Sequence, residues 1–410
     1  MNTIGATNAA ISTKAIGYGA VWIVFAISGI VYFEPAPFDI ALLILTVFFF
    51  LCGLRIPGWM TAPIALLILI FIMSIIGAAQ SAPLGDNIRH GVITLYLTVS
   101  TIFVGCYVYS DPGPATRVIF KAYAIAALLA AIAGIIGYFS LTDMAFNLFT
   151  ENSRARGTFK DPNVFGPFLI IPALFAFYRL IEGAGARAPY WLMVFLVLSA
   201  AILLSFSRGA WGHYLLSFMI CLFLLFFTSS NRKIRYRISV ATLIVVVLCV
   251  FGLTVILSLE TVSKVLVERL QLFQSYDIGG AAGRFDGQMF ALKVILSNPL
   301  GIGAKGFSDL WSQAPHNVYL HNFLIAGWIG GFAYLAFVIS TFICGLAAAL
   351  RPSPYQGIAI VLFASFFGLI TLGLLIDTDH WRHFYVLAGL IWGLSGAVLN
   401  LPRPVPASLQ

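Results

Sequence analysis

Long apolar runs, separated by short polar joints, cover almost the whole chain. Crossing the ~30 Å hydrocarbon core of a membrane takes about 20 apolar residues in a helix. Runs of roughly this length recur about twelve times along the sequence. The pattern predicts an all-α integral membrane protein of about twelve transmembrane helices, forming a single polytopic domain over residues 1–410. The expected spans are 15–33, 38–54, 60–79, 92–109, 120–139, 165–181, 190–206, 209–227, 238–258, 319–345, 357–375 and 384–400.

Composition excludes a water-soluble domain. Hydrophobic residues make up 60% of the chain and charged residues only 9%. A soluble domain needs about 25% charged residues to cover its surface. The apolar runs leave no segment long enough for such a domain.

Lysine and arginine in the short joints predict the orientation. The densest cluster, 231–237, lies between the eighth and ninth expected spans, and placing it in the cytoplasm also puts both termini there. The first helix is expected to stay uncleaved. Of the 23 Lys and Arg residues, this topology places twelve inside and eleven outside. Such a weak asymmetry means either that the topology is wrong or that the outward cations have a function.

Two outward segments are longer than turns. One runs over about 141–164, and the other forms a large loop over 259–318 between spans nine and ten. Apolar residues recur at helical spacing in 262–273 and in 284–296. We expect amphipathic helices there, lying at the membrane surface.

Three cations lie close together in the first outward segment. Arg154, Arg156 and Lys160 flank a Gly and precede a Pro, so a turn is expected to expose backbone N–H groups beside guanidinium forks. Such a set can bind phosphate oxygens. The alternative is a positive loop that snorkels to the headgroups. Arg208, at the tight joint of spans seven and eight, has the same two interpretations.

The large loop carries further candidates. Arg284 opens one helical stretch, where a local ion pair with Asp286 is the structural alternative. His316 and His321 lie where the loop meets span ten, and a histidine there can accept a proton near neutral pH. The structural alternative is a helix cap or a hydrogen-bonded side chain. Their spacing of five does not match the i, i+4 pair of a helical zinc site.

Three weaker patterns remain. The turn 377–383 holds two Asp, two His and Arg382, and could bind a metal, but the arginine would oppose a cation, so a satisfied ion network is expected. The glycines of 301–306 fit a dinucleotide pattern by letters alone, without the strand that the motif requires. Gly327 and Gly331 are expected to pack span ten against a neighbouring helix.

Five short motifs in a fixed order resemble the O-antigen ligase and polymerase family of bacterial membrane glycosyltransferases. The resemblance covers about residues 150–335. It rests on Arg156-Gly157-Thr158-Phe159 followed by Pro162-Asn163, Ser207-Arg208-Gly209, Gly283-Arg284, Pro299-Leu300-Gly301-Ile302-Gly303 and His316-Asn317-Val318-Tyr319.

The resemblance implies a glycan donor carried on undecaprenyl pyrophosphate and an acceptor sugar hydroxyl, such as that of lipid A–core, at the periplasmic face of the bacterial inner membrane. Transfer is expected to invert the anomeric centre and to need no metal and no further cofactor. Cations would stabilise the departing pyrophosphate and a base would accept the hydroxyl proton. The expected residues are Arg156, Arg208, Arg284, Arg154 and Lys160 for the first role and His316 for the second, with His321, Asn317 and Tyr319 as secondary candidates.

Other functions stay open at this point. A polymerase would use the same donor and share these motifs, and we favour the ligase because of the late loop and its His-Asn pair. A transporter or flippase would hold ionisable residues near mid-membrane, whereas the spans here are nearly free of charge. A purely structural protein would leave the outward Arg and His residues without a role. Membrane lipid is an expected partner, and nucleic acid is not.

Overall fold

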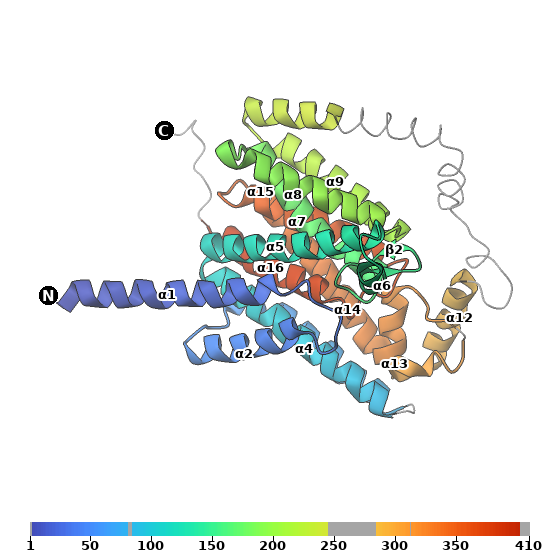
Figure 1. The fold of residues 1–410 in the computed structure, drawn as a ribbon. Coiled ribbons are helices and arrows are strands. Elements are labelled where there is room, and N and C mark those ends of the chain that lie inside the picture. The colour runs from blue at the N-terminus through green and yellow to red at the C-terminus, as the bar shows by residue number, and fades with distance from the viewer. Residues whose placement is uncertain (1, 81–83, 245–283, 312, 402–410) are drawn as a thin grey trace, which may run out of the picture.

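The computed structural model describes residues 2–80, 84–244, 284–311 and 313–401 (Figure 1). Helices dominate this part of the chain, and its one sheet is a two-stranded hairpin. The longer helices are α1 (Asn2–Ala26), α2 (Pro37–Leu51), α3 (Thr61–Ala78), α4 (Leu84–Ser110), α5 (Pro112–Tyr138), α7 (Pro162–Glu182), α8 (Ala188–Leu204), α9 (Arg208–Thr228), α12 (Arg284–Ser297), α14 (Val318–Leu350), α15 (Gln356–Leu372) and α16 (Arg382–Leu399). The short elements are η1 (Gly58–Met60), α6 (Asp143–Phe149), β1 (Thr150–Glu151), β2 (Arg154–Ala155), η2 (Gly185–Arg187) and α13 (Gly303–Gly306).

Eight helices of the described chain are long and apolar enough to cross a membrane, namely α3, α4, α5, α7, α8, α9, α14 and α16. Three shorter apolar helices are Lys14–Ala26 within α1, α2 and α15. These helices coincide with eleven of the expected spans. The remaining one, 238–258, runs beyond residue 244, and the helix expected over 262–273 lies outside the described residues. The chain is therefore an all-helical, multi-pass membrane protein, with eight spans of full length in the part described.

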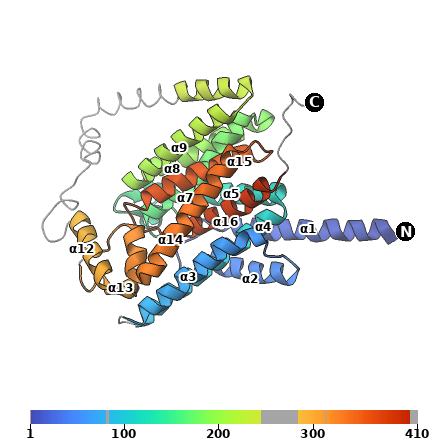
Figure 2. The same cartoon turned by 180° about the vertical axis from the view of Figure 1, so that it is seen from behind.

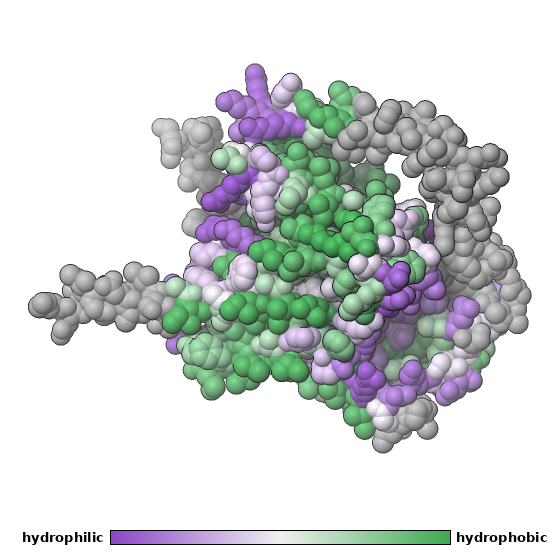
Figure 3. All heavy atoms as spheres, viewed as in Figure 1, coloured by the Kyte–Doolittle hydropathy of each residue, from purple (hydrophilic) through white to green (hydrophobic). Residues whose placement is uncertain are grey.

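Burial distinguishes central helices from those that face lipid. In the apolar windows of α16 and α7, 83% and 78% of residues are buried, against 28% in α8. Large apolar side chains stay exposed along α2, α3, α8 and α9. Figure 3 shows a broad hydrophobic surface over the middle of the molecule, with hydrophilic side chains gathered towards its ends. This distribution suits a bundle surrounded by hydrocarbon, in which α16 and α7 lie mostly inside the protein.

One end of the bundle collects the joints that were expected to face outward. We name it the hairpin end and define it by joints 27–36, 139–161, 205–207 and 373–381, near α6 and β2 in Figure 1. Three hydrogen bonds connect segments there: Val31 N to Thr158 O at 3.0 Å, Arg154 Nε to Ser205 O at 2.9 Å, and Val318 N to Gly373 O at 2.8 Å.

The opposite end gathers joints that were expected to be cytoplasmic. Tyr18 of α1 donates a hydrogen bond to Asp111, and Asn400 at the end of α16 donates to the Tyr109 hydroxyl at 3.3 Å. Because Tyr109 and Asp111 are two residues apart, α1 and the last residues of α16 meet at this end.

A break in α14 corrects one expectation. Gly327 does not pack as part of a regular helix, because its backbone angles of φ 64° and ψ −166° interrupt α14. The segment Pro299 to Gly301 lies against the break, where Trp328 N donates to Pro299 O at 2.9 Å. On the other side of the break, Ile302 N donates to Leu324 O at 2.7 Å. The Pro-x-Gly-x-Gly motif thus satisfies backbone groups that the break would leave unpaired inside a membrane. Figure 2 shows α14 from the side on which α12 and α13 adjoin it.

Candidate functional site at the hairpin end

A tight hairpin presents the first group of cations. Strands β1 and β2 pair antiparallel, with Glu151 opposite Arg154. The two residues between them, Asn152 and Ser153, have positive φ angles of 49° and 59°. This is the backbone of a two-residue turn whose twist matches the strands that it joins. The turn therefore fixes Arg154 and the following Arg156 at this end of the bundle.

Arg154 connects two of the predicted motifs. Its Nε donates to Ser205 O at 2.9 Å, and a terminal nitrogen donates to Asn163 Oδ1 at 2.8 Å. Arg208 begins α9 three residues after Ser205, and the Ser207 side chain caps that helix by accepting from Ala210 N. The structure therefore brings the segment of Arg154 and the Ser-Arg-Gly step together.

The environment of Arg156 is neutral. Its guanidinium donates to the carbonyl oxygens of Leu148, Asn147 and Lys160 and to the Tyr32 hydroxyl, at 3.3–3.4 Å. It also lies over the Tyr32 ring, 5.3 Å from the centroid. No carboxylate of the described residues pairs with Arg156. A half-buried guanidinium held by neutral groups keeps its full charge for an anion.

Lys160 differs from Arg156 in having a counterion. Its Nζ lies 3.3 Å from Glu34 Oε2, an oxygen that also contacts Arg89 at 3.3 Å. Acids are in fact plentiful on this side. The expected topology places all 15 Asp and Glu residues except Asp111 and Glu182 on the outward side, which leaves 15 − 2 = 13 acids beside the eleven outward cations. At the hairpin end, Lys160 and Arg89 are therefore paired through Glu34, whereas Arg156 is not paired with a carboxylate of the described residues.

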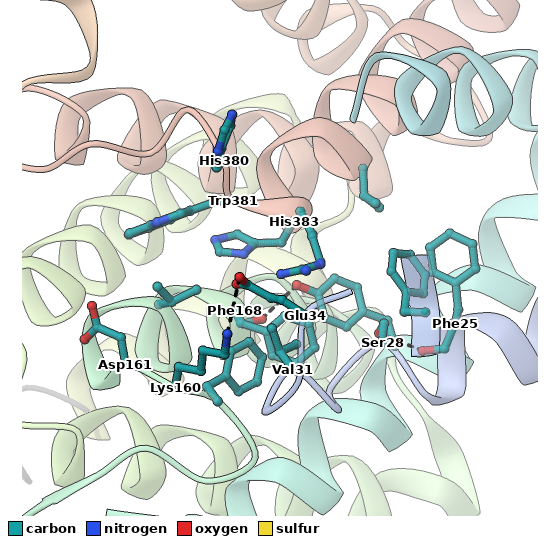
Figure 4. A pocket seen from close by; sticks show the side chains of 16 residues that line it. Phe25, Ser28, Val31, Glu34, Lys160, Asp161, Phe168, His380, Trp381 and His383 are labelled. Carbon is teal, nitrogen blue, oxygen red and sulfur yellow. Dashed lines mark hydrogen bonds and ion pairs between the residues drawn. The ribbon is translucent and has the colours of Figure 1, made fainter. Parts of the chain in front are cut away.

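A cavity of about 210 Å³ opens beside Lys160, between α1, α5, α7 and α16. Most of its wall is apolar or aromatic, and its polar residues come from the joints at the hairpin end. In Figure 4, Lys160 and Glu34 meet on one side of the cavity, and His380 and His383 lie across from them. The apolar wall is formed by Phe25, Val31, Phe38, Tyr123, Phe159, Val164, Phe168 and Val386.

The His-Asn motif forms the start of α14. His316 has a positive φ of 48°, and the next residue, Asn317, caps the helix by accepting from Tyr319 N and Leu320 N. The Tyr319 hydroxyl donates to Ile370 O at 2.7 Å. Asn317 and Tyr319 therefore have structural roles in this arrangement. His316 is half-buried in a sharp bend that these two residues stabilise.

A second cavity, also of about 210 Å³, lies next to this bend. Its wall includes Pro315, directly before His316, together with Lys305, Ser308 and His321. His321 Nδ1 lies 3.5 Å from Asp377 Oδ1. A histidine held by a carboxylate at a cavity wall is a standard arrangement for a base. His321 thus competes with His316 for that role on geometric grounds.

The turn between α15 and α16 gathers more histidine than the sequence indicated. Asp379 Oδ2 lies 3.3 Å from His90 Nε2 and 4.0 Å from His380 Nε2. Burial opposes ionisation of Asp379, but the surrounding His321, His380 and His90 lower the pKa of its carboxyl. Burial lowers the pKa of His380 to about 3, against the attraction of Asp379. His90 was missed because it lies in the polar start of α4, just before the expected span 92–109, with no motif around it.

Arg284 begins α12, as the helical pattern over 284–296 predicts. Its side chain lies outside the part of the chain that the structure describes. The apolar face of α12 packs on α14 through Ala291, Val294 and Leu324. Lys305 lies in α13, a single turn with no strand before it in the described residues. The dinucleotide pattern of these glycines is thereby excluded.

Comparison with known proteins supports the resemblance. A family model described as O-antigen ligase matches residues 193–335, from α8 to the middle of α14. No curated protein matches the chain. The matched part contains Arg208, Arg284 and His316, whereas Arg154, Arg156 and Lys160 precede it. The match confirms the resemblance to the O-antigen ligase and polymerase family of membrane glycosyltransferases and supports a function of that type.

Proposed function

We propose that the chain is an O-antigen ligase-type glycosyltransferase. It moves a glycan from undecaprenyl pyrophosphate to a sugar hydroxyl of lipid A–core, at the periplasmic face of the bacterial inner membrane. The hairpin end then faces the periplasm, and both termini face the cytoplasm. A reporter fused after Arg235 tests this orientation, because a periplasmic signal there would place the candidate site away from its substrates.

The observation that carries the proposal is the state of Arg156. The Arg156 guanidinium lies at the hairpin end and donates only to neutral oxygens, so its charge is available to a pyrophosphate. Arg154, two residues earlier, is held by Ser205 and Asn163, and Arg208 begins the adjoining helix α9. Arg208 follows Arg154 by 54 positions in the sequence, and the hydrogen bond from Arg154 to Ser205 brings the start of α9 to the segment that holds Arg154 and Arg156.

The cavity beside Lys160 supports a lipid-linked donor. Its aromatic and aliphatic walls suit an isoprenoid chain. Its volume of about 210 Å³ is large enough for only part of a long lipid. The rest of such a chain would lie in the bilayer between the exposed apolar helices.

The chemistry is a single displacement. The acceptor oxygen forms a bond to the anomeric carbon while the bond from that carbon to the pyrophosphate oxygen breaks, so the configuration inverts. The hydroxyl proton passes to His316, with His321 as the alternative base, and the electron pair of the broken bond leaves with the pyrophosphate. Arginines that stabilise this developing charge make metal unnecessary for the step.

Two alternatives make different predictions. An O-antigen or exopolysaccharide polymerase would use the same donor and extend a lipid-linked glycan. A transporter or flippase would need ionisable groups along a path through the bilayer. The charged residues here gather at helix ends, as in Asp39 and Arg382 at the first turns of α2 and α16, which favours chemistry at one face.

Glycan profiling of a deletion strain tests the proposal. The strain is complemented with wild type, Arg156→Ala, His316→Ala or, as a control cation at the same end, Arg89→Ala. Loss of capped lipid A–core with accumulation of long lipid-linked chains supports the ligase. Single repeats with intact capping indicate the polymerase. An unchanged ladder in the deletion strain contradicts a role in this polysaccharide.

A further inference from the structure

The turn between α15 and α16 and the first third of α4 form a cluster to which the proposed displacement assigns no chemical step. Nitrogen atoms of His90 and His380 and a carboxylate oxygen of Asp379 all lie within 4.8 Å of one another. His90 is separated from Asp379 by 289 positions in the chain. We propose that these three residues bind a divalent transition-metal ion, with zinc as the best-suited metal, and that the ion fixes α4 to the α15–α16 turn.

The distances suit a small tetrahedral ion. With metal–ligand bonds of 2.0–2.2 Å, neighbouring ligand atoms of a tetrahedral zinc site lie roughly 3.3–3.5 Å apart. The separation of His90 Nε2 and Asp379 Oδ2 is 3.3 Å, and that of His380 Nε2 and Asp379 Oδ2 is 4.0 Å. Small side-chain rotations close the second distance. Two imidazoles and one carboxylate are a ligand set typical of zinc, with water in the fourth position.

The charge of the cluster favours a cation. Asp377 and Asp379 lie in the same turn, and no Lys or Arg of the described residues pairs with either carboxylate. Both side chains are largely removed from water, with 16% and 12% of their surface exposed. Asp377 Oδ1 and His321 Nδ1 face each other at 3.5 Å, and neither atom has another hydrogen-bond partner in the described residues. Negative charge held away from water is costly unless it is compensated.

The sequence pattern suggested that Arg382 would oppose a metal ion, but in the structure it does not. Its guanidinium forms two hydrogen bonds to Asp39, at 2.6 and 2.7 Å, so that its charge is neutralised by a different carboxylate. Thr94 competes with the ion for one ligand, because its hydroxyl lies 3.2 Å from His380 Nε2. Thr94 keeps a partner when the metal takes that nitrogen, because its hydroxyl also lies 3.0 Å from His90 O.

The inference is independent of the proposed transfer, since the ion connects two structural elements and takes no part in the displacement. The untagged protein in detergent, stripped with chelator and then dialysed against zinc, is expected to retain about one ion per chain by mass spectrometry. His90→Gln, His380→Gln and Asp379→Asn should each lose it. His316→Gln is the matched control, a half-buried histidine at the same end that should leave the stoichiometry unchanged.

Cobalt substitution keeps the test decisive if a variant fails to fold. Wild-type protein loaded with Co²⁺ should show the intense visible absorption of a tetrahedral site, and zinc should displace it. The unfolding temperature of wild type should also rise with free zinc, since a ligand that binds the folded state stabilises it. The proposal is overturned if wild type binds no metal, if Co²⁺ gives no tetrahedral spectrum, or if His316→Gln loses metal equally.

Discussion

Arg382 and Asp39 are 343 positions apart in the chain and form a two-pronged ion pair, with N–O distances of 2.6 and 2.7 Å. Asp39 lies in the first turn of α2, where its carboxylate also accepts a hydrogen bond from Ala36 N at 2.8 Å. Only 9% of the Asp39 side chain and 21% of the Arg382 side chain are exposed. The pair therefore joins the second helix to the last one inside the protein.

Removing one partner of this pair should be strongly destabilising. Asp39→Ala leaves a largely buried guanidinium without a counterion, and we expect a loss of about 3–5 kcal/mol in the free energy of unfolding. Thermal unfolding in detergent measures the effect. The control is Arg89→Ala, which removes the more exposed pair with Glu34 and should cost about 0–1 kcal/mol. Equal losses in the two variants would contradict a special role for the Asp39 pair.

Arg156 should be needed for transfer and should not be replaceable by lysine. Arg156→Ala removes a charge that the protein leaves available to an anion, and we expect the rate of glycan transfer to fall about 100- to 1,000-fold. Arg156→Lys keeps a charge but loses the planar fork, and should recover only part of the rate. Transfer is measured with purified protein and a lipid-linked donor. A wild-type rate in Arg156→Ala, with Arg89→Ala as the reference, would remove the basis of the proposed pyrophosphate site.

Substitution of His316 and His321 should separate the base from its competitor. If His316 accepts the hydroxyl proton, His316→Ala lowers the rate about 100- to 10,000-fold. His321→Ala should then have the smaller effect. Single-turnover rates with saturating donor distinguish this loss from weaker binding. The reverse order would assign the base to His321, which lies 3.5 Å from Asp377 at the wall of the second cavity.

Chelation should spare the transfer reaction. Protein treated with EDTA is expected to keep its rate when assayed at a temperature where it stays folded, since arginines and not a metal stabilise the leaving group. Its unfolding temperature should nevertheless be lower than that of zinc-loaded protein, because of the proposed ion. A rate that disappears with EDTA and returns with magnesium would contradict the metal-free mechanism.

The break in α14 should tolerate no side chain. A Cβ at residue 327 would lie 2.3 Å from Pro299 O, and the φ of 64° with ψ of −166° is a region that essentially only glycine adopts. Gly327→Ala should therefore lower stability by at least roughly 1–3 kcal/mol. Gly212→Ala in α9 is the matched control, because nothing lies within 4 Å of its Cβ position. Similar unfolding temperatures for the two variants would show that the break can rearrange.

The sequence by itself determined the class, most of the helices and the family motifs of this protein. A membrane span must form its backbone hydrogen bonds within the helix and must face hydrocarbon. A run of about 20 apolar residues in the sequence therefore predicts it directly. The confirmed helix at 284–296 and the tight joint before Arg208 depend on equally local rules. The family resemblance, too, needs only the order of short motifs.

Only the tertiary structure decided which charges remain available. In the sequence, Arg382 opposes a cation in the 377–383 turn, but in the structure its charge is paired with Asp39. Lys160 resembles Arg156 in the sequence, but in the structure it is paired with Glu34. His90 of α4 contacts the α15–α16 turn although it lies 289 positions before Asp379, and Gly327 proved to break its helix where Pro299 packs. These outcomes depend on contacts between residues that are far apart in the chain, such as Asp39 and Arg382. Pairing energies of buried charges are set by the distance to the partner, which the pattern along a chain does not encode.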